Sequence, residues 1–329
     1  MSGNHNQSLE RALKIVDAIA ETGVDALKLQ TYTADTMTIP VNTEDFLIED
    51  KKSLWHGKNL HDLYQEAYTP WEWHKQLFDR CKEKGMICFS TPFDETAVDF
   101  LESLNVPMYK IASFENNHLP LIKRVAQTGK PIIISTGMAT LSNLEDMVKT
   151  AKDNVCSDLT LLKCTSTYPA SPENSNLLTI PHLARLFDVK VGLSDHTLGI
   201  GAAIASVALG AKVIEKHVTL SRAEGGVDAA FSMEPHEMKQ LVDEVKTASL
   251  ALGNVHYGVS SKQEEKSKVF KRSIYAIKDI KKGDKLTQNN IRIIRPGNGL
   301  APKYYEQIIN RVVVSDIAKG TAMNWSYIY

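Results

Sequence analysis

Two histidines stand at the ends of neighbouring predicted strands and could bind a metal ion together. His196 follows the apolar run VKVGLSD, and His217 follows KVIEK. Two imidazoles can form part of a divalent metal site that substrate oxygens and water complete. A single histidine there would as readily be a hydrogen-bonded core residue, so the pair is what favours a metal. Asp195 could orient a ligand or the substrate, and a purely structural role fits it equally well.

Two lysines, Lys28 and Lys110, end further predicted strands in apolar surroundings. A buried ammonium group without a partner is costly, so an anionic ligand is expected beside them. Hydroxyl groups at other strand ends would add donors for phosphate and carboxylate oxygens. These are Ser113, Ser135, Thr136, Ser166 and Ser194. A Schiff-base role for either lysine is the competing interpretation, and the histidine pair argues against it.

These side chains need a fold that brings strand ends together. Apolar runs alternate with helical patterns and predict strands at 25–30, 86–91, 107–113, 131–136, 158–165, 189–195 and 211–218. Such alternation indicates a parallel sheet covered by helices. Polar residues follow every strand, and a closed barrel is the α/β architecture that gathers all strand ends at one mouth. We therefore expect a TIM (β/α)8 barrel.

The strand count is one short of the eight that this barrel requires. The chain opens with the loop-like SGNHNQS and continues into an amphipathic helix that Gly23 ends, so the first strand is missing. Either the chain starts inside the barrel, through truncation or a misassigned start, or one short irregular strand escapes the count; we favour the former. A polar excursion before Pro70 is typical of a loop over a site.

The chain is long enough for a large domain and a small one. The predicted barrel domain covers 1–254, a polar linker covers 255–268, and a compact β-rich domain covers 269–329. Short β-type runs, SIYAIKDI, IRIIRPG and RVVVSDI, alternate with turn sequences in the last part.

Charge and composition narrow the partners to small molecules. The 38 Lys and Arg against 39 Asp and Glu give a formal net charge of -1, which argues against nucleic acid and anionic membranes as partners. No apolar run approaches the roughly 18 residues of a membrane span, and no signal peptide is recognisable. The four cysteines lack zinc spacing and predict reduced thiols in a cytoplasmic protein.

Ordered motifs along essentially the whole chain resemble the N-acetylneuraminate synthase family. They are SGNHNQS, KLQTYTADT, FSTPFD, YKIASFE, IIISTGM, CTSTYP, GLSDHT, EKHVT, GGVDAAFSMEP and RPGNG. Within the family, SGNHNQSLERAL, KLQTYTADTM and GGVDAAFS look most like the branch that makes pseudaminic acid. The last 60 or so residues resemble the antifreeze-like SAF domain that ends these enzymes.

The resemblance implies condensation of phosphoenolpyruvate with 2,4-diacetamido-2,4,6-trideoxy-altrose at a divalent metal, Mn²⁺ before Mg²⁺ or Co²⁺. His196 and His217 would bind the metal. The residues matching phosphoenolpyruvate-binding positions are Lys28, Thr91, Lys110, Ser113, Ser135 and Ser194, and Ser166 stands where neuraminate synthases have asparagine. Those matching sugar-binding positions are Gln30, Glu115, Tyr168, Asp228 and Arg295, the arginine coming from the partner subunit of a swapped homodimer.

One expected residue is not in this chain. In the family, a glutamate assigned acid/base work precedes the segment matched by SGNH, so the expected base lies upstream of Met1. The resemblance therefore predicts metal and phosphoenolpyruvate binding and leaves turnover by this chain open. The alternatives are an N-acetylneuraminate or legionaminic acid synthase and, from another class, a truncated, catalytically silent sugar-acid binding protein.

Overall fold

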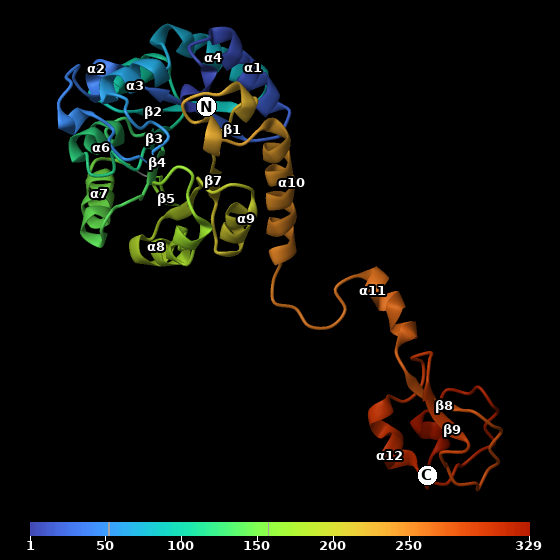
Figure 1. The fold of residues 1–329 in the computed structure, drawn as a ribbon. Coiled ribbons are helices and arrows are strands. Elements are labelled where there is room, and N and C mark those ends of the chain that lie inside the picture. The colour runs from blue at the N-terminus through green and yellow to red at the C-terminus, as the bar shows by residue number, and fades with distance from the viewer. Residues whose placement is uncertain (52, 157) are drawn as a thin grey trace. The chain divides into compact units, whose positions relative to one another are not determined.

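The computed structural model describes residues 1–51, 53–156 and 158–329. The chain divides into two compact units, Met1–Gly253 and Asn254–Tyr329. The first unit is a curled parallel sheet with helices around its outside (Figure 1). In the described residues, no helix is long and apolar enough to span a bilayer.

Seven parallel strands form the sheet, and each pairs with the next along the sequence. They are β1 (Ala26–Thr31), β2 (Ile87–Pro92), β3 (Tyr109–Ile111), β4 (Ile132–Ser135), β5 (Leu159–Cys164), β6 (Lys190–Ser194) and β7 (Val213–Glu215). Their sequential order and common direction confirm the predicted (β/α) barrel class, here as a curled half-barrel. All seven strand C-terminal ends therefore lie at one mouth.

The helices cover the sheet because each has one apolar face. They are α1 (Leu9–Ala20), α2 (Ala34–Met37), α3 (Leu60–Ala67), α4 (Trp71–Glu83), α5 (Glu95–Ser103), α6 (Leu119–Ala126), α7 (Leu141–Asp153), α8 (Thr179–Phe187), α9 (Gly201–Ala208) and α10 (Pro235–Leu252). In α1 the Ser8 hydroxyl accepts the Arg11 amide as the N-cap, and Ile15 and Ile19 are buried on one face. The amphipathic helix that the sequence predicts before Gly23 is confirmed.

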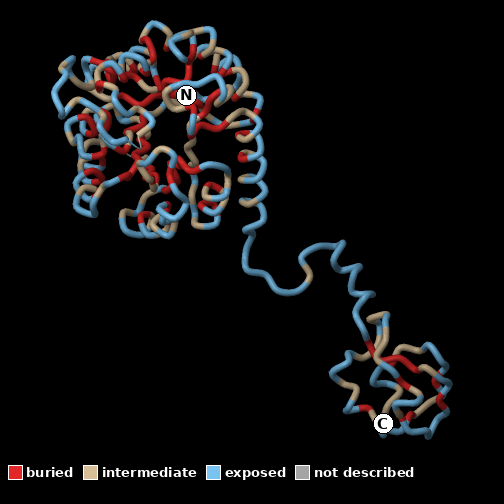
Figure 2. The backbone as a smooth tube through the Cα atoms, in the orientation of Figure 1, coloured by how far each residue is buried: buried red, intermediate tan, exposed pale blue. Residues whose placement is uncertain are grey.

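Apolar side chains from the strands and the inner helix faces make up the core. One large cluster includes Ile111, Ile134 and Leu161 with residues of α5 to α8, and a second includes Leu29 with residues of α1 and α4. Figure 2 shows the buried segments concentrated on the strands of the first unit. The four cysteines are free, as the sequence predicted, and all four are buried.

No strand among the described residues joins β7 to β1. The N-terminal segment, which includes a 3-10 helix at Ser2–His5, contacts both edges instead. The Met1 amine donates to the Lys28 carbonyl at 2.8 Å, and the Asn4 amide donates to the Val218 carbonyl at 2.8 Å. The strand count predicted from the sequence is therefore confirmed, and residues 1–5 are buried between the two edges.

The second unit has its own small core, which includes Ile274, Leu286 and Val313. Strand β8 (Ser273–Ala276) pairs antiparallel with β9 (Ile291–Ile294), and α12 (Tyr305–Ile308) follows. The run RVVVSDI forms only isolated bridges, such as Val313 with Ile328, rather than the expected strand. The polar segment before β8 is not wholly irregular, because it contains α11 (Lys262–Lys266), capped by Ser261.

Candidate functional site

The mouth of the half-barrel brings together most of the predicted site residues. Lys28, Gln30, Thr91, Lys110, Ser135 and Ser194 lie in the strands themselves, and Ser113, Glu115, Ser166, Tyr168, His196 and His217 lie in the segments that follow them. Asp228 lies in the segment between β7 and α10, near His217. Arg295 belongs to the second unit, where it is exposed and has no hydrogen bond or ion pair with a described residue.

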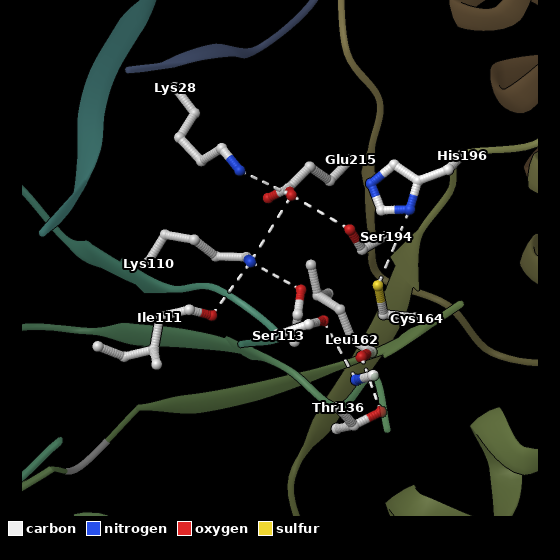
Figure 3. Close-up of polar contacts among 12 residues, drawn as sticks. Lys28, Lys110, Ile111, Ser113, Thr136, Leu162, Cys164, Ser194, His196 and Glu215 are labelled. Carbon is white, nitrogen blue, oxygen red and sulfur yellow. Dashed lines mark hydrogen bonds and ion pairs between the residues drawn. The ribbon is translucent and has the colours of Figure 1, made fainter. Parts of the chain in front are cut away.

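The two lysines converge on a carboxylate that the sequence did not single out, Glu215. Its Oε1 lies 2.7 Å from Lys28 Nζ and 3.6 Å from Lys110 Nζ, and it accepts the Ser194 hydroxyl at 3.2 Å. Lys110 also donates to the Ser135 hydroxyl at 2.7 Å. Figure 3 shows Lys28, Lys110 and Ser194 directed at Glu215. A negative charge thus already sits among the groups expected to bind an anion.

Burial and neighbouring charges set the ionisation of this cluster. Lys110 is 1% exposed, and burial lowers its pKa to about 8, although Glu215 opposes that shift. Burial alone would raise the pKa of Glu215, but the charges of Lys110 and Lys28 hold that pKa well below its usual range. The carboxylate is therefore ionised at neutral pH and keeps Lys110 protonated.

One signal in the sequence could have revealed Glu215. It lies two positions before His217 in VIEKH, and side chains two apart on a strand point to the same face. The residue between them, Lys216, points the other way and serves a different contact. Alternation along the strand therefore places Glu215 on the same face as His217, although Glu215 was not among the predicted site residues.

The loop after β4 forms a tight, hydroxyl-lined cradle next to the lysines. The Gly137 amide donates to the Ser113 hydroxyl at 3.2 Å, and Asn116 donates to the Gly137 carbonyl at 2.9 Å. A Cβ on Gly137 would lie 2.7 Å from the Ser113 oxygen and would overlap the Ser166 hydroxyl. Both serines therefore face one small space that a side chain at Gly137 would fill.

Two other predicted hydroxyls differ in their surroundings. The buried Thr91 hydroxyl has no hydrogen-bond partner among the described residues, as expected for a group that awaits a ligand. The Thr136 hydroxyl donates to the Leu162 carbonyl at 3.0 Å and so supports the strand instead. The expectation of Thr136 as an anion donor was wrong, because its backbone amide and hydroxyl both bond to the neighbouring strand β5.

The two histidine rings are neighbours at the mouth, with ring centroids 5.4 Å apart. His196 Nδ1 lies 3.0 Å from the Thr165 carbonyl, and His217 Nδ1 lies 3.2 Å from the Ser2 hydroxyl and 3.5 Å from the Asp228 carboxylate. Neither Nε2 has a hydrogen bond to a described residue. Protein contacts thus fix one nitrogen of each ring and leave the other for a ligand, the arrangement usual for metal-binding histidines.

The two free Nε2 atoms of His196 and His217 fit a divalent ion that the protein holds by two side chains. In the part of the chain that the structure describes, no three His, Cys, Asp or Glu residues are grouped to hold a metal. Water and substrate oxygens would have to complete the coordination. Burial lowers the pKa of His217, which favours the neutral imidazole that a metal requires.

Asp195 forms a buried ion pair behind the histidines. Its carboxylate lies 2.8 Å from Lys216 Nζ and accepts the Thr197 amide at 2.9 Å. Lys216 also donates to the Thr197 and Gly199 carbonyls at 2.7 and 3.0 Å. Asp195 makes no hydrogen bond to either histidine, so the structure favours the structural alternative, a tether between the segments that follow β6 and β7.

Aromatic rings line the side of the mouth away from the lysines. The Tyr168 ring centroid lies 4.6 Å from His196 and 5.1 Å from Phe231, and Phe231 lies 5.0 Å from His217. Burial raises the pKa of the nearby Glu115 to about 7, and its Oε2 has no partner among the described residues. One side of the mouth is therefore cationic and hydroxyl-rich, and the other is aromatic.

Comparison with known proteins gives consistent matches. Residues 15–257 match the NeuB family, and residues 271–327 match the SAF domain. A pseudaminic acid synthase of Helicobacter pylori is 45% identical over 98% of this chain and 95% of its own length. A pseudaminic acid synthase of Campylobacter jejuni is 43% identical over 98% of this chain and 93% of its own length.

A solved structure supports the same relationship. The N-acetylneuraminic acid synthetase of Leptospira borgpetersenii, crystallised with citrate, has a TM-score of 0.69 and 30% identity. The match covers 80% of this chain and 86% of that one. The family resemblance predicted from the motifs is thus confirmed, while the roles of individual residues stay predictions.

Proposed function

The chain belongs to the NeuB family, and we propose that it condenses phosphoenolpyruvate with 2,4-diacetamido-2,4,6-trideoxy-altrose to give pseudaminic acid and phosphate. The observation that carries this proposal is the pair of lysines and the serine cradle beside two histidines at one mouth. The choice of acceptor rests on the two relatives named pseudaminic acid synthase, at 45% and 43% identity.

Phosphoenolpyruvate would bind on the cationic side of the mouth. Lys28 and Lys110 would contact its phosphate and carboxylate oxygens, and the hydroxyls of Ser113, Ser135 and Thr91 would donate to the remaining oxygens. Lys110 is buried, and its ammonium group is already held in place by the Glu215 carboxylate. Little reorganisation of this side chain is therefore needed when phosphoenolpyruvate binds. Its contribution is chiefly positioning and electrostatic stabilisation.

The acceptor would bind between the histidines and the aromatic side. A divalent ion bound by His196 and His217, Mn²⁺ on the family resemblance, would polarise the aldehyde oxygen of the open-chain sugar. Tyr168 would pack against the sugar, the Gln30 amide would donate hydrogen bonds to its hydroxyl groups or accept them, and the Asp228 carboxylate would accept them. Glu115, with its pKa raised to about 7, can hold a proton at the mouth near neutral pH.

The proposed reaction forms one carbon–carbon bond and releases phosphate. C3 of phosphoenolpyruvate attacks the aldehyde carbon, whose oxygen becomes a hydroxyl group. Water adds to C2, and phosphate leaves by cleavage of the C2–oxygen bond. The lysines hold the phosphate throughout, so they stabilise the charge that it carries away.

Two further parts of the proposal concern assembly and location. We propose that Arg295 of one subunit lies at the sugar site of its partner in a swapped homodimer, which would explain why an exposed arginine with no ion pair among the described residues follows β9. The chain would act in the cytoplasm, where its four free, buried thiols stay reduced.

Phosphate release tests the reaction, and an isotope tests the bond that breaks. We expect release that requires both the acceptor and added Mn²⁺ after chelation. With phosphoenolpyruvate labelled by oxygen-18 at the bridging C2 oxygen, the label should leave in phosphate. Label retained in the nine-carbon product would contradict carbon–oxygen cleavage.

A further inference from the structure

The excursion between α2 and α3 contacts the mouth through one aromatic side chain, Trp55. Most residues of 38–58 that the structure describes are exposed or half-buried. The Trp55 indole N–H donates to the Val227 carbonyl at 2.9 Å, across 172 positions of sequence. Its ring centroid lies 6.0 Å from that of Tyr168. A single residue thus joins the excursion to two segments of the site.

Both contacts of Trp55 lead directly to groups at the centre of the mouth. Tyr168 packs on His196 at 4.6 Å, and Val227 precedes Asp228, whose carboxylate lies 3.5 Å from His217 Nδ1. The indole therefore contacts Tyr168, the neighbour of His196, directly and lies one residue from Asp228, the neighbour of His217. It makes no contact with the lysines on the opposite, cationic side.

The segment that carries Asp228 is held from two sides. On the inner side the Asp228 amide donates to the Asn4 side chain at 3.2 Å, and a Cβ on Gly226 would lie 3.1 Å from the same oxygen. On the outer side the only hydrogen bond from the excursion to this segment, among described residues, is that of Trp55 to Val227. Removing the indole would free the outer side alone.

Space lies beyond the indole. A cavity of about 620 Å³ is lined by Trp55 and Val227 together with Asn6, Leu54 and Lys58. Because Trp55 also contacts Tyr168, it separates this cavity from the aromatic side of the mouth. A smaller side chain would join the two spaces and let larger sugar substituents enter.

We propose that Trp55 is a specificity-determining residue that forms the outer aromatic wall of the acceptor site. The inference rests on the proposed function and names the ligand class, an acetamido or deoxy sugar whose methyl groups pack on indole and phenol rings. Such amphipathic substituents suit an aromatic surface with few hydrogen-bonding groups. Through Val227, the same indole keeps Asp228 in position.

Two substitutions separate these roles. Trp55→Phe keeps a ring and removes the hydrogen bond, so we expect the acceptor KM to rise about fivefold, equivalent to ~1 kcal/mol. Trp55→Ala also removes the wall, and we expect a rise of about 30-fold, with reduced preference between the altrose acceptor and N-acetylmannosamine. The KM for phosphoenolpyruvate should stay within about twofold in both variants.

The matched control is Trp71→Phe, because Trp71 also donates its indole N–H to a backbone carbonyl, that of Tyr32 at 3.2 Å, but packs on Phe100. Trp71→Phe should leave the ratio of the acceptor KM to the phosphoenolpyruvate KM unchanged. Equal rises in both KM values, or an unchanged acceptor KM in a folded Trp55→Ala protein, would overturn the assignment alone. A wild-type chain that turns over neither sugar would overturn the proposed function and this assignment with it.

Discussion

Neutralising Glu215 should destabilise the barrel unit strongly and make its stability depend on a bound anion. In Glu215→Gln, Lys28 and Lys110 lose the negative charge of the carboxylate whose Oε1 lies 2.7 and 3.6 Å from their ammonium groups. Removing one partner of a buried ion pair costs about 3–5 kcal/mol, and the 15% exposure of the Glu215 side chain favours the lower end. For a unit of this size, ~3 kcal/mol corresponds to a Tm about 6–12 °C lower.

Thermal unfolding with and without phosphoenolpyruvate measures both parts of this prediction. The ligand would supply the negative charge that the variant lacks, so its stabilising shift should be larger in Glu215→Gln than in the wild type. Glu83→Gln is the control, because its exposed pair with Arg80 should change Tm by no more than a degree or two. The role given to Glu215 would be refuted if Glu215→Gln had the same Tm as the wild type, or if phosphoenolpyruvate raised the Tm of the variant by no more than it raises that of the wild type.

Three further predictions concern the same mouth. Gly137→Ala should raise the KM for phosphoenolpyruvate at least about tenfold, because the new methyl group overlaps the Ser166 hydroxyl, whereas Gly201→Ala, with open space around it, should not. Affinity for phosphoenolpyruvate, measured by calorimetry, should fall as pH rises through about 8, where Lys110 loses its proton. Glu115 binds a proton more tightly when folded, so its contribution to stability is lost as pH rises through about 7, and Glu115→Gln should raise Tm at pH 8.

Much of the frame could be predicted because local patterns determine it. The apolar runs that form β1, β4 and β6 are long enough for buried strands, and their regular alternation with amphipathic helices leaves few alternative topologies. Parallel strands in sequential order then bring their C-terminal ends together. This is why the lysines, the serines and both histidines were found at one mouth.

The remaining features depend on which side chains meet across the barrel. In VIEKH, alternation puts Glu215 on the same face as His217, but nothing local reveals its lysine partners, which come from β1 and β3. Trp55 reaches Val227 from 172 positions away, through an excursion without apolar periodicity. Thr136 was misassigned because a strand-end hydroxyl can turn to the neighbouring strand as easily as to a ligand.

The direct test of the account is turnover of two acceptors by the same purified chain. With phosphoenolpyruvate and Mn²⁺, kcat/KM should be higher for 2,4-diacetamido-2,4,6-trideoxy-altrose than for N-acetylmannosamine, with one phosphate released per nine-carbon acid formed. A preference for N-acetylmannosamine would contradict the proposed acceptor, and the absence of phosphate release with either sugar would contradict the proposed reaction.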